Sequence, residues 1–169
     1  IEAGFPISSD GDFDAVKAIA AAVRRPIIAG LARAIPADID RAWEALSGAA
    51  RPRIHVFLAT SDIHLEHKLR ITRAQCLEQI KRSVAHARAL CADVEFSAED
   101  ATRSDLAFLC EVSVAAVDAG ATTINLPDTV GYALPADIQT MFSTVKPLLG
   151  ERAVLSAHCH NDLGMAVAN

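Results

Sequence analysis

Short runs of apolar and β-branched residues alternate along the chain with longer segments in which apolar residues recur every three or four positions. The short runs predict six strands. The longer segments, which place apolar residues on one face and charges on the other, predict five helices between them. The predicted strands are Ile1–Gly4, Pro26–Leu31, Arg53–Ala59, Asp93–Ser97, Thr122–Leu126 and Ala153–Ala157.

Helix-capping signals agree with this reading. Thr72 and Gln75 are spaced as a capping box at the start of the third helix. Pro36 and Pro135 fall in the first turns of two others, where a missing backbone N–H costs nothing.

Strict alternation of strand and helix predicts a parallel sheet with right-handed crossovers. An open doubly wound sheet would bring a glycine-rich phosphate loop after an early strand, and the chain has none. We therefore predict an α/β fold, a partial (β/α)8 TIM barrel of about six strands and five helices. A whole barrel takes about 250 residues, so the barrel's first and last strands are expected to lie outside this chain. Residues 1–169 form one partial catalytic domain in this prediction.

Composition narrows the class of protein. The 169 residues carry a net charge of −5, and only 5% of them are aromatic, which disfavours nucleic acid or an anionic membrane as partner. No apolar run approaches the roughly 18–20 residues of a membrane span. The four cysteines form no CxxC pair, which favours a reducing compartment, and we expect a cytoplasmic protein.

Polar residues follow the strand cores, at the end of a barrel where active sites are built. The clearest signal is His158-Cys159-His160, because residues two apart in a strand point to the same side. Two imidazoles on one face can bind a divalent metal if a carboxylate joins them. Cys159 is expected to face the helices as a small buried side chain.

Other strand ends supply further candidates with competing interpretations. Ser97 and Glu99 share a face, and Glu99 is either an acid/base group at the barrel mouth or a helix-start carboxylate. Asn125 and Thr129 lie at the next strand end, where Pro127 is expected to end regular pairing. His55 lies inside a predicted strand, and the pattern alone is compatible with either a histidine of the core or a residue of the pocket.

Four segments resemble the 2-isopropylmalate synthases, which belong to the metal-dependent, acyl-CoA-condensing barrels together with homocitrate and citramalate synthases. The segments are Thr60–Leu69, Val94–Ala101, Asn125–Gly131 and His158–Asn169. The last of them, HCHNDLGMAVAN, is typical of the wider group, whereas SDIHLEHK and LPDTVG favour the isopropylmalate branch.

The resemblance implies a Claisen-type condensation of acetyl-CoA with 2-oxoisovalerate, giving 2-isopropylmalate for leucine synthesis. It implies a divalent cation, Mg²⁺ or Mn²⁺ with Zn²⁺ as an alternative, bound by His158 and His160. By the same matching, His55, Ser97, Glu99, Asn125 and Thr129 line the 2-oxo acid pocket, with Glu99 as the catalytic residue.

The family's Arg-Asp-Glu motif, a second metal-binding Asn and a C-terminal regulatory domain have no counterpart in these residues. We therefore expect residues 1–169 alone to lack synthase activity, and the full-length protein to be a homodimer. Three alternatives remain open at this stage. They are a sibling synthase or acyl-CoA lyase of the same barrel family, a zinc hydrolase, and a fragment that binds without catalysis.

Overall fold

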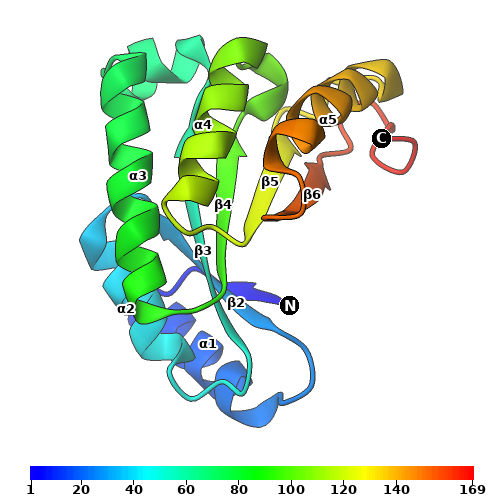
Figure 1. The fold of residues 1–169 in the computed structure, drawn as a ribbon. Coiled ribbons are helices and arrows are strands. Elements are labelled where there is room, and N and C mark those ends of the chain that lie inside the picture. Colours follow the sequence, from blue (N-terminus) through cyan, green and yellow to red (C-terminus); the bar gives the residue numbers. More distant parts are fainter.

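The computed structural model describes all residues from 1 to 169, and they form one six-stranded sheet with its helices (Figure 1). The strands are β1 (Glu2–Gly4), β2 (Ile28–Arg33), β3 (Pro52–Ala59), β4 (Val94–Glu99), β5 (Thr123–Asp128) and β6 (Val154–Cys159). The α-helices are α1 (Asp10–Ala22), α2 (Pro36–Leu46), α3 (Arg73–Leu90), α4 (Leu106–Asp118) and α5 (Pro135–Leu149). A π-helix, η1 (His64–Leu69), follows β3, and a short 3₁₀ turn, η2 (Ala101–Arg103), follows β4.

The strands pair in sequence order, β1 to β6, and every pair is parallel. The sheet curls into part of a barrel, and consecutive helices pack against one another along one side of it (Figure 1). The predicted partial TIM barrel is therefore confirmed. None of the helices combines the length and the apolar character that crossing a membrane requires.

Strand residues alternate between the two faces of this sheet. Ile54, Val56, Phe96 and Ile124 are fully buried between strands and helices, where they form the centre of the hydrophobic core. The residues between them, such as His55, point to the inner, concave face. This alternation follows from the two-residue period of a strand, and it decides which side chains reach the interior of the barrel.

Local signals locate most elements, with two differences at the strand ends. The capping box of Thr72 and Gln75 is present, and Pro36 and Pro135 begin their helices. Strand β2 and strands β4 to β6 each end two residues later than expected. Pro127 does not end β5, because it pairs in register with His158 after the ladder to β4 has stopped at Asn125. Its missing N–H therefore costs no hydrogen bond to β4.

Candidate active site

A cavity of about 380 Å³ opens on the inner face of the sheet at the carboxyl ends of the strands. All seven candidate residues line it: His55, Ser97, Glu99, Asn125, Thr129, His158 and His160. Four further residues also line it: Glu2, Leu31, Phe57 and Pro127. Two larger hollows, of about 720 and 780 Å³, lie among the helices and beside β6, and no candidate residue lines either. The convergence in the inner cavity marks it as the candidate site.

His158 and His160 lie side by side at the end of β6. Their rings are stacked, with centroids 4.9 Å apart and an angle of 16° between the ring planes. The N–H of His160 donates to the carbonyl of Asp128 at 3.2 Å, which joins this edge strand to β5. Cys159 packs against the core from the opposite face. The alternation expected for the His-Cys-His run is therefore present.

The chemistry of this pair suits a metal ion in part. Burial lowers the pKa of His158, and the neighbouring imidazoles of His160 and His55 add to that effect. The ring is therefore neutral at neutral pH, which is the form that donates a nitrogen lone pair to a metal. Two nitrogen ligands do not complete a six-coordinate Mg²⁺ or Mn²⁺ site, so oxygen ligands from other groups are needed.

The floor of the cavity is a chain of hydrogen bonds centred on His55. Its Nε2 lies 2.6 Å from Ser97 Oγ, and its Nδ1 lies 3.1 Å from Glu2 Oε1. Asn125 Nδ2 donates to the same Ser97 oxygen at 2.7 Å. Asn125 is 4% exposed, and its Oδ1 has no hydrogen-bond partner. The cavity therefore offers a buried acceptor that a ligand can satisfy.

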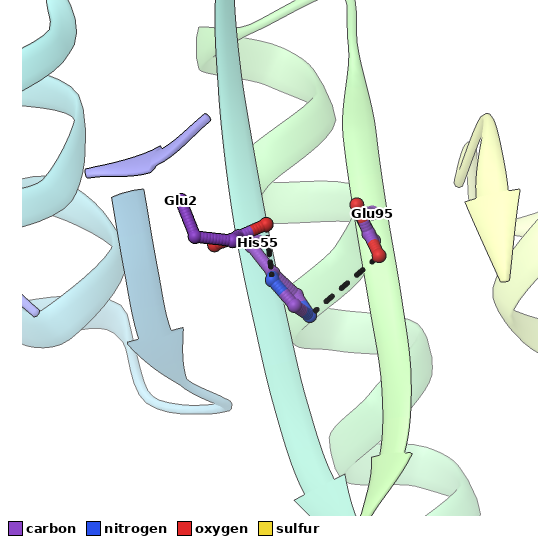
Figure 2. Close-up of side chains that lie close together, drawn as sticks. All are labelled: Glu2, His55 and Glu95. Carbon is purple, nitrogen blue, oxygen red and sulfur yellow. Dashed lines mark hydrogen bonds and ion pairs between the residues drawn. The ribbon is translucent and has the colours of Figure 1, made fainter. Parts of the chain in front are cut away.

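Sequence reasoning missed two carboxylates in this region, Glu2 and Glu95. Figure 2 shows both beside His55 on the face turned away from the helices. Burial raises the pKa of Glu2, but the hydrogen bond and charge of His55 outweigh it, so the net pKa lies below its usual value. Glu95 accepts from Arg53 at 2.9 Å. The position of Glu95, in phase with Ser97, could have identified it.

These three residues are close enough to share a cation, since one ligand atom from each lies within 4.8 Å of the others. Both ring nitrogens of His55, however, already have hydrogen-bond partners, and Glu95 is paired with Arg53. Hydrogen bonds and the ion pair with Arg53 therefore already satisfy the polar groups of these three residues. His158 and His160 remain the better nitrogen pair for a metal.

Glu99 and Thr129 stand at the rim of the cavity. Both carboxylate oxygens of Glu99 accept from Lys68 Nζ, at 2.7 and 3.0 Å. The backbone N–H of Asp100 donates to Thr129 Oγ1 at 2.9 Å, so the hydroxyl proton of Thr129 is free for a ligand. Two fully buried carboxylates lie beside them: Asp100, which directly follows β4, and Asp128, the last residue of β5. Lys68 also escaped sequence reasoning, because it lies 31 residues from its partner Glu99 in the sequence.

Comparison with known proteins identifies the family of this chain. A sequence profile of the HMGL-like family matches residues 1–169. Among curated relatives, 2-isopropylmalate synthases from Dictyoglomus turgidum and Pelotomaculum thermopropionicum are each 58% identical, over 171 and 173 residues. Both alignments cover 100% of this chain and 34% of the relative. The chain thus spans about a third of the length of these relatives, and the resemblance seen in its motifs is confirmed.

Solved structures support the fold. Hydroxymethylglutaryl-CoA lyase from Pseudomonas aeruginosa superposes with a TM-score of 0.75 at 19% identity, covering 98% of this chain and 56% of the lyase. The HMG-CoA lyase of Bacillus subtilis gives a TM-score of 0.69 at 21% identity, covering 93% and 52%. At such identities the likeness concerns the fold alone. Because the family profile extends over the whole chain, the chain belongs to the HMGL-like family.

Proposed function

We propose that this chain is part of the catalytic barrel of a 2-isopropylmalate synthase. Such an enzyme joins the methyl carbon of acetyl-CoA to the ketone carbon of 2-oxoisovalerate, and water then releases CoA from the thioester. The single observation that carries the proposal is the gathering of all seven candidate side chains around one cavity on the inner face. The names of the curated relatives support the same reaction.

The size and lining of the cavity suit a small 2-oxo acid. A volume of about 380 Å³ lies at the lower end of the range for small-molecule sites. Leu31, Phe57 and Pro127 provide apolar wall for a branched alkyl group. Thr129 donates its free hydroxyl proton to the substrate carboxylate. Asn125 Oδ1 is a buried acceptor in the same cavity, so the site offers both apolar and polar contacts.

His158 and His160 would hold the divalent cation, Mg²⁺ or Mn²⁺ with Zn²⁺ as the alternative, together with oxygen ligands from other groups. When bound, the ion supplies Lewis-acid polarisation of the 2-oxo group. Glu99 is the catalytic carboxylate, because it lines the cavity and in its ionised form can accept the proton that the methyl group of acetyl-CoA loses. His55 and Ser97, fixed by Glu2 and Asn125, form an ordered hydrogen-bonding surface against the substrate.

We also propose that the full-length protein is cytoplasmic and forms a homodimer. The four cysteines are free thiols, as a reducing compartment maintains them. Size-exclusion chromatography with light scattering on the full-length protein measures whether it forms a homodimer. A monomeric mass would contradict it.

The reaction is tested by following free thiol as CoA is released by the full-length protein. Acetyl-CoA is supplied with 2-oxoisovalerate, pyruvate or 2-oxoglutarate, each with Mg²⁺ or Mn²⁺. We expect the fastest release with 2-oxoisovalerate and loss of most activity in Glu99→Gln. Preference for another 2-oxo acid would indicate a sibling synthase. Thiol release that no 2-oxo acid stimulates would contradict the proposal.

A further inference from the structure

Lys68 is the only side chain that binds Glu99. Its Nζ donates to Oε1 at 2.7 Å and to Oε2 at 3.0 Å, so both carboxylate oxygens are held by one ammonium group. Lys68 does not line the cavity, whereas Glu99 does. The ammonium group therefore approaches the carboxylate from outside the cavity, as a group that acts on Glu99.

The surrounding backbone leaves the Glu99 side chain as the movable part. Glu99 is the last residue of β4, and its carbonyl accepts from the N–H of Thr60 at 3.0 Å. The next residue, Asp100, donates its N–H to Thr129. With the main chain fixed on both sides, only the side-chain torsions of Glu99 remain to be set. The ion pair with Lys68 sets them.

The segment that carries Lys68 is itself well anchored. Lys68 lies in the π-helix η1. Helices of this type are rare in proteins as a whole, but those that occur are often at functional sites. Leu65 of this helix is buried in the core, and the hydroxyl of Ser61, just before it, donates to the buried carboxylate of Asp100. Arg70 ends η1 in the left-handed conformation, with φ of 56°. These contacts tie η1 to the core and to the segment after β4, next to Glu99.

We propose that Lys68 is a positioning residue for Glu99. It holds the carboxylate in the orientation that faces the reacting atoms, without touching the substrate itself. This inference rests on the proposed function, since it concerns the efficiency of the Glu99 step. A small displacement of a reacting group costs on the order of 10- to 100-fold in rate. We expect a loss of this size in kcat when Lys68 is replaced.

The test compares Lys68→Met, Lys68→Arg and a matched control in the full-length enzyme. Lys81→Met is the control, because Lys81 binds Glu78 at 2.8 Å on the outer side of α3 and is 45% exposed, against 49% for Lys68. We expect Lys68→Met to lower kcat while KM for the 2-oxo acid stays within about twofold of wild type. Lys68→Arg restores most of kcat, and Lys81→Met leaves both constants unchanged. A rise in KM at unchanged kcat would overturn the inference, because it would mean that Lys68 binds the substrate.

A double-mutant cycle with Glu99→Gln isolates the coupling. If Lys68 acts through Glu99, then Lys68→Met adds no further loss in the Glu99→Gln background. Equal losses in both backgrounds would overturn the inference. So would a crystal structure of Lys68→Met in which the Glu99 carboxylate keeps its orientation. A wild-type enzyme that releases no thiol overturns the proposed function as well, whereas an active wild type with unimpaired Lys68→Met overturns only this inference.

Discussion

Asp128 offers the most quantitative test of how the rim of the site is held together. Its carboxylate is fully buried and accepts three hydrogen bonds. Thr102 Oγ1 and the N–H of Tyr132 donate to one oxygen, at 3.1 and 3.3 Å, and the N–H of Ala133 donates to the other at 3.0 Å. The carbonyl of Asp128 also accepts from the N–H of His160. The side chain of Asp128 thus joins the segments after β4 and β5, and its backbone carbonyl binds the histidine pair.

The Asp128→Asn substitution keeps the size of this side chain and replaces one acceptor oxygen with an NH₂ group. Either orientation of the amide turns a donor toward a backbone N–H, so either the buried N–H of Ala133 or the partly buried N–H of Tyr132 loses its partner. An unsatisfied buried donor costs about 1–3 kcal/mol. We therefore expect the free energy of unfolding to fall by about 2 kcal/mol. Asp128→Ala, which leaves all three donors without a partner, should cost about 2–5 kcal/mol.

Urea denaturation followed by circular dichroism measures the change. With a slope of about 2 kcal/mol per molar urea, a loss of about 2 kcal/mol lowers the midpoint by roughly 1 M. Asp118→Asn is the control, because Asp118 is 60% exposed and binds only Arg152 on the surface. It should stay within about 0.5 kcal/mol of wild type. An Asp128→Asn midpoint as close to wild type as the control would refute the reasoning about buried donors.

Two further outcomes follow from the structure. Gly131 has φ of +63°, and a Cβ there would lie 2.3 Å from Asp162 Oδ2, so Gly131→Ala should lower the midpoint of thermal unfolding. Gly11→Ala in helix α1 is the control. Because a Cβ at Gly11 meets only an ordinary contact, this change should leave the thermal midpoint equal or higher. Burial raises the pKa of the Cys76 thiol to about 12, so almost no thiolate exists at pH 8. Mass spectrometry should therefore find Cys76 unlabelled by iodoacetamide at pH 8 in the folded protein and labelled in urea, and rapid labelling without urea would contradict its burial.

The sequence predicted the architecture because two local signals agree. Apolar periodicity separated strands from helices, and the parity of each strand told which residues face inward. In a barrel the carboxyl ends of all strands meet at one rim, so residues as distant as His55 and His160 could be assigned to one site. The position of all seven candidate residues around one cavity could be predicted from strand parity, from the common rim of the strand ends and from the family resemblance.

The remaining features depend on contacts between loops, which periodicity does not encode. Ser61 donates a hydrogen bond to Asp100, which is 39 residues away in the sequence, and Thr102 donates one to Asp128, which is 26 residues away. The segment after β3 forms the π-helix that carries Lys68, and the apolar periodicity of the sequence did not predict a helix there. The partnership of Glu2 with His55 likewise arises only when the sheet curls.

The central claim is that His158 and His160, on the inner face of the barrel, form the nitrogen part of a divalent-metal site. A crystal of the full-length protein soaked with Mn²⁺ and 2-oxoisovalerate tests this most directly, because anomalous scattering locates the ion. We predict one Mn²⁺ peak bound by both imidazoles, with the 2-oxo acid in the cavity beside Thr129. A peak among Glu2, His55 and Glu95 instead, or no peak within coordination distance of either histidine, would contradict the account.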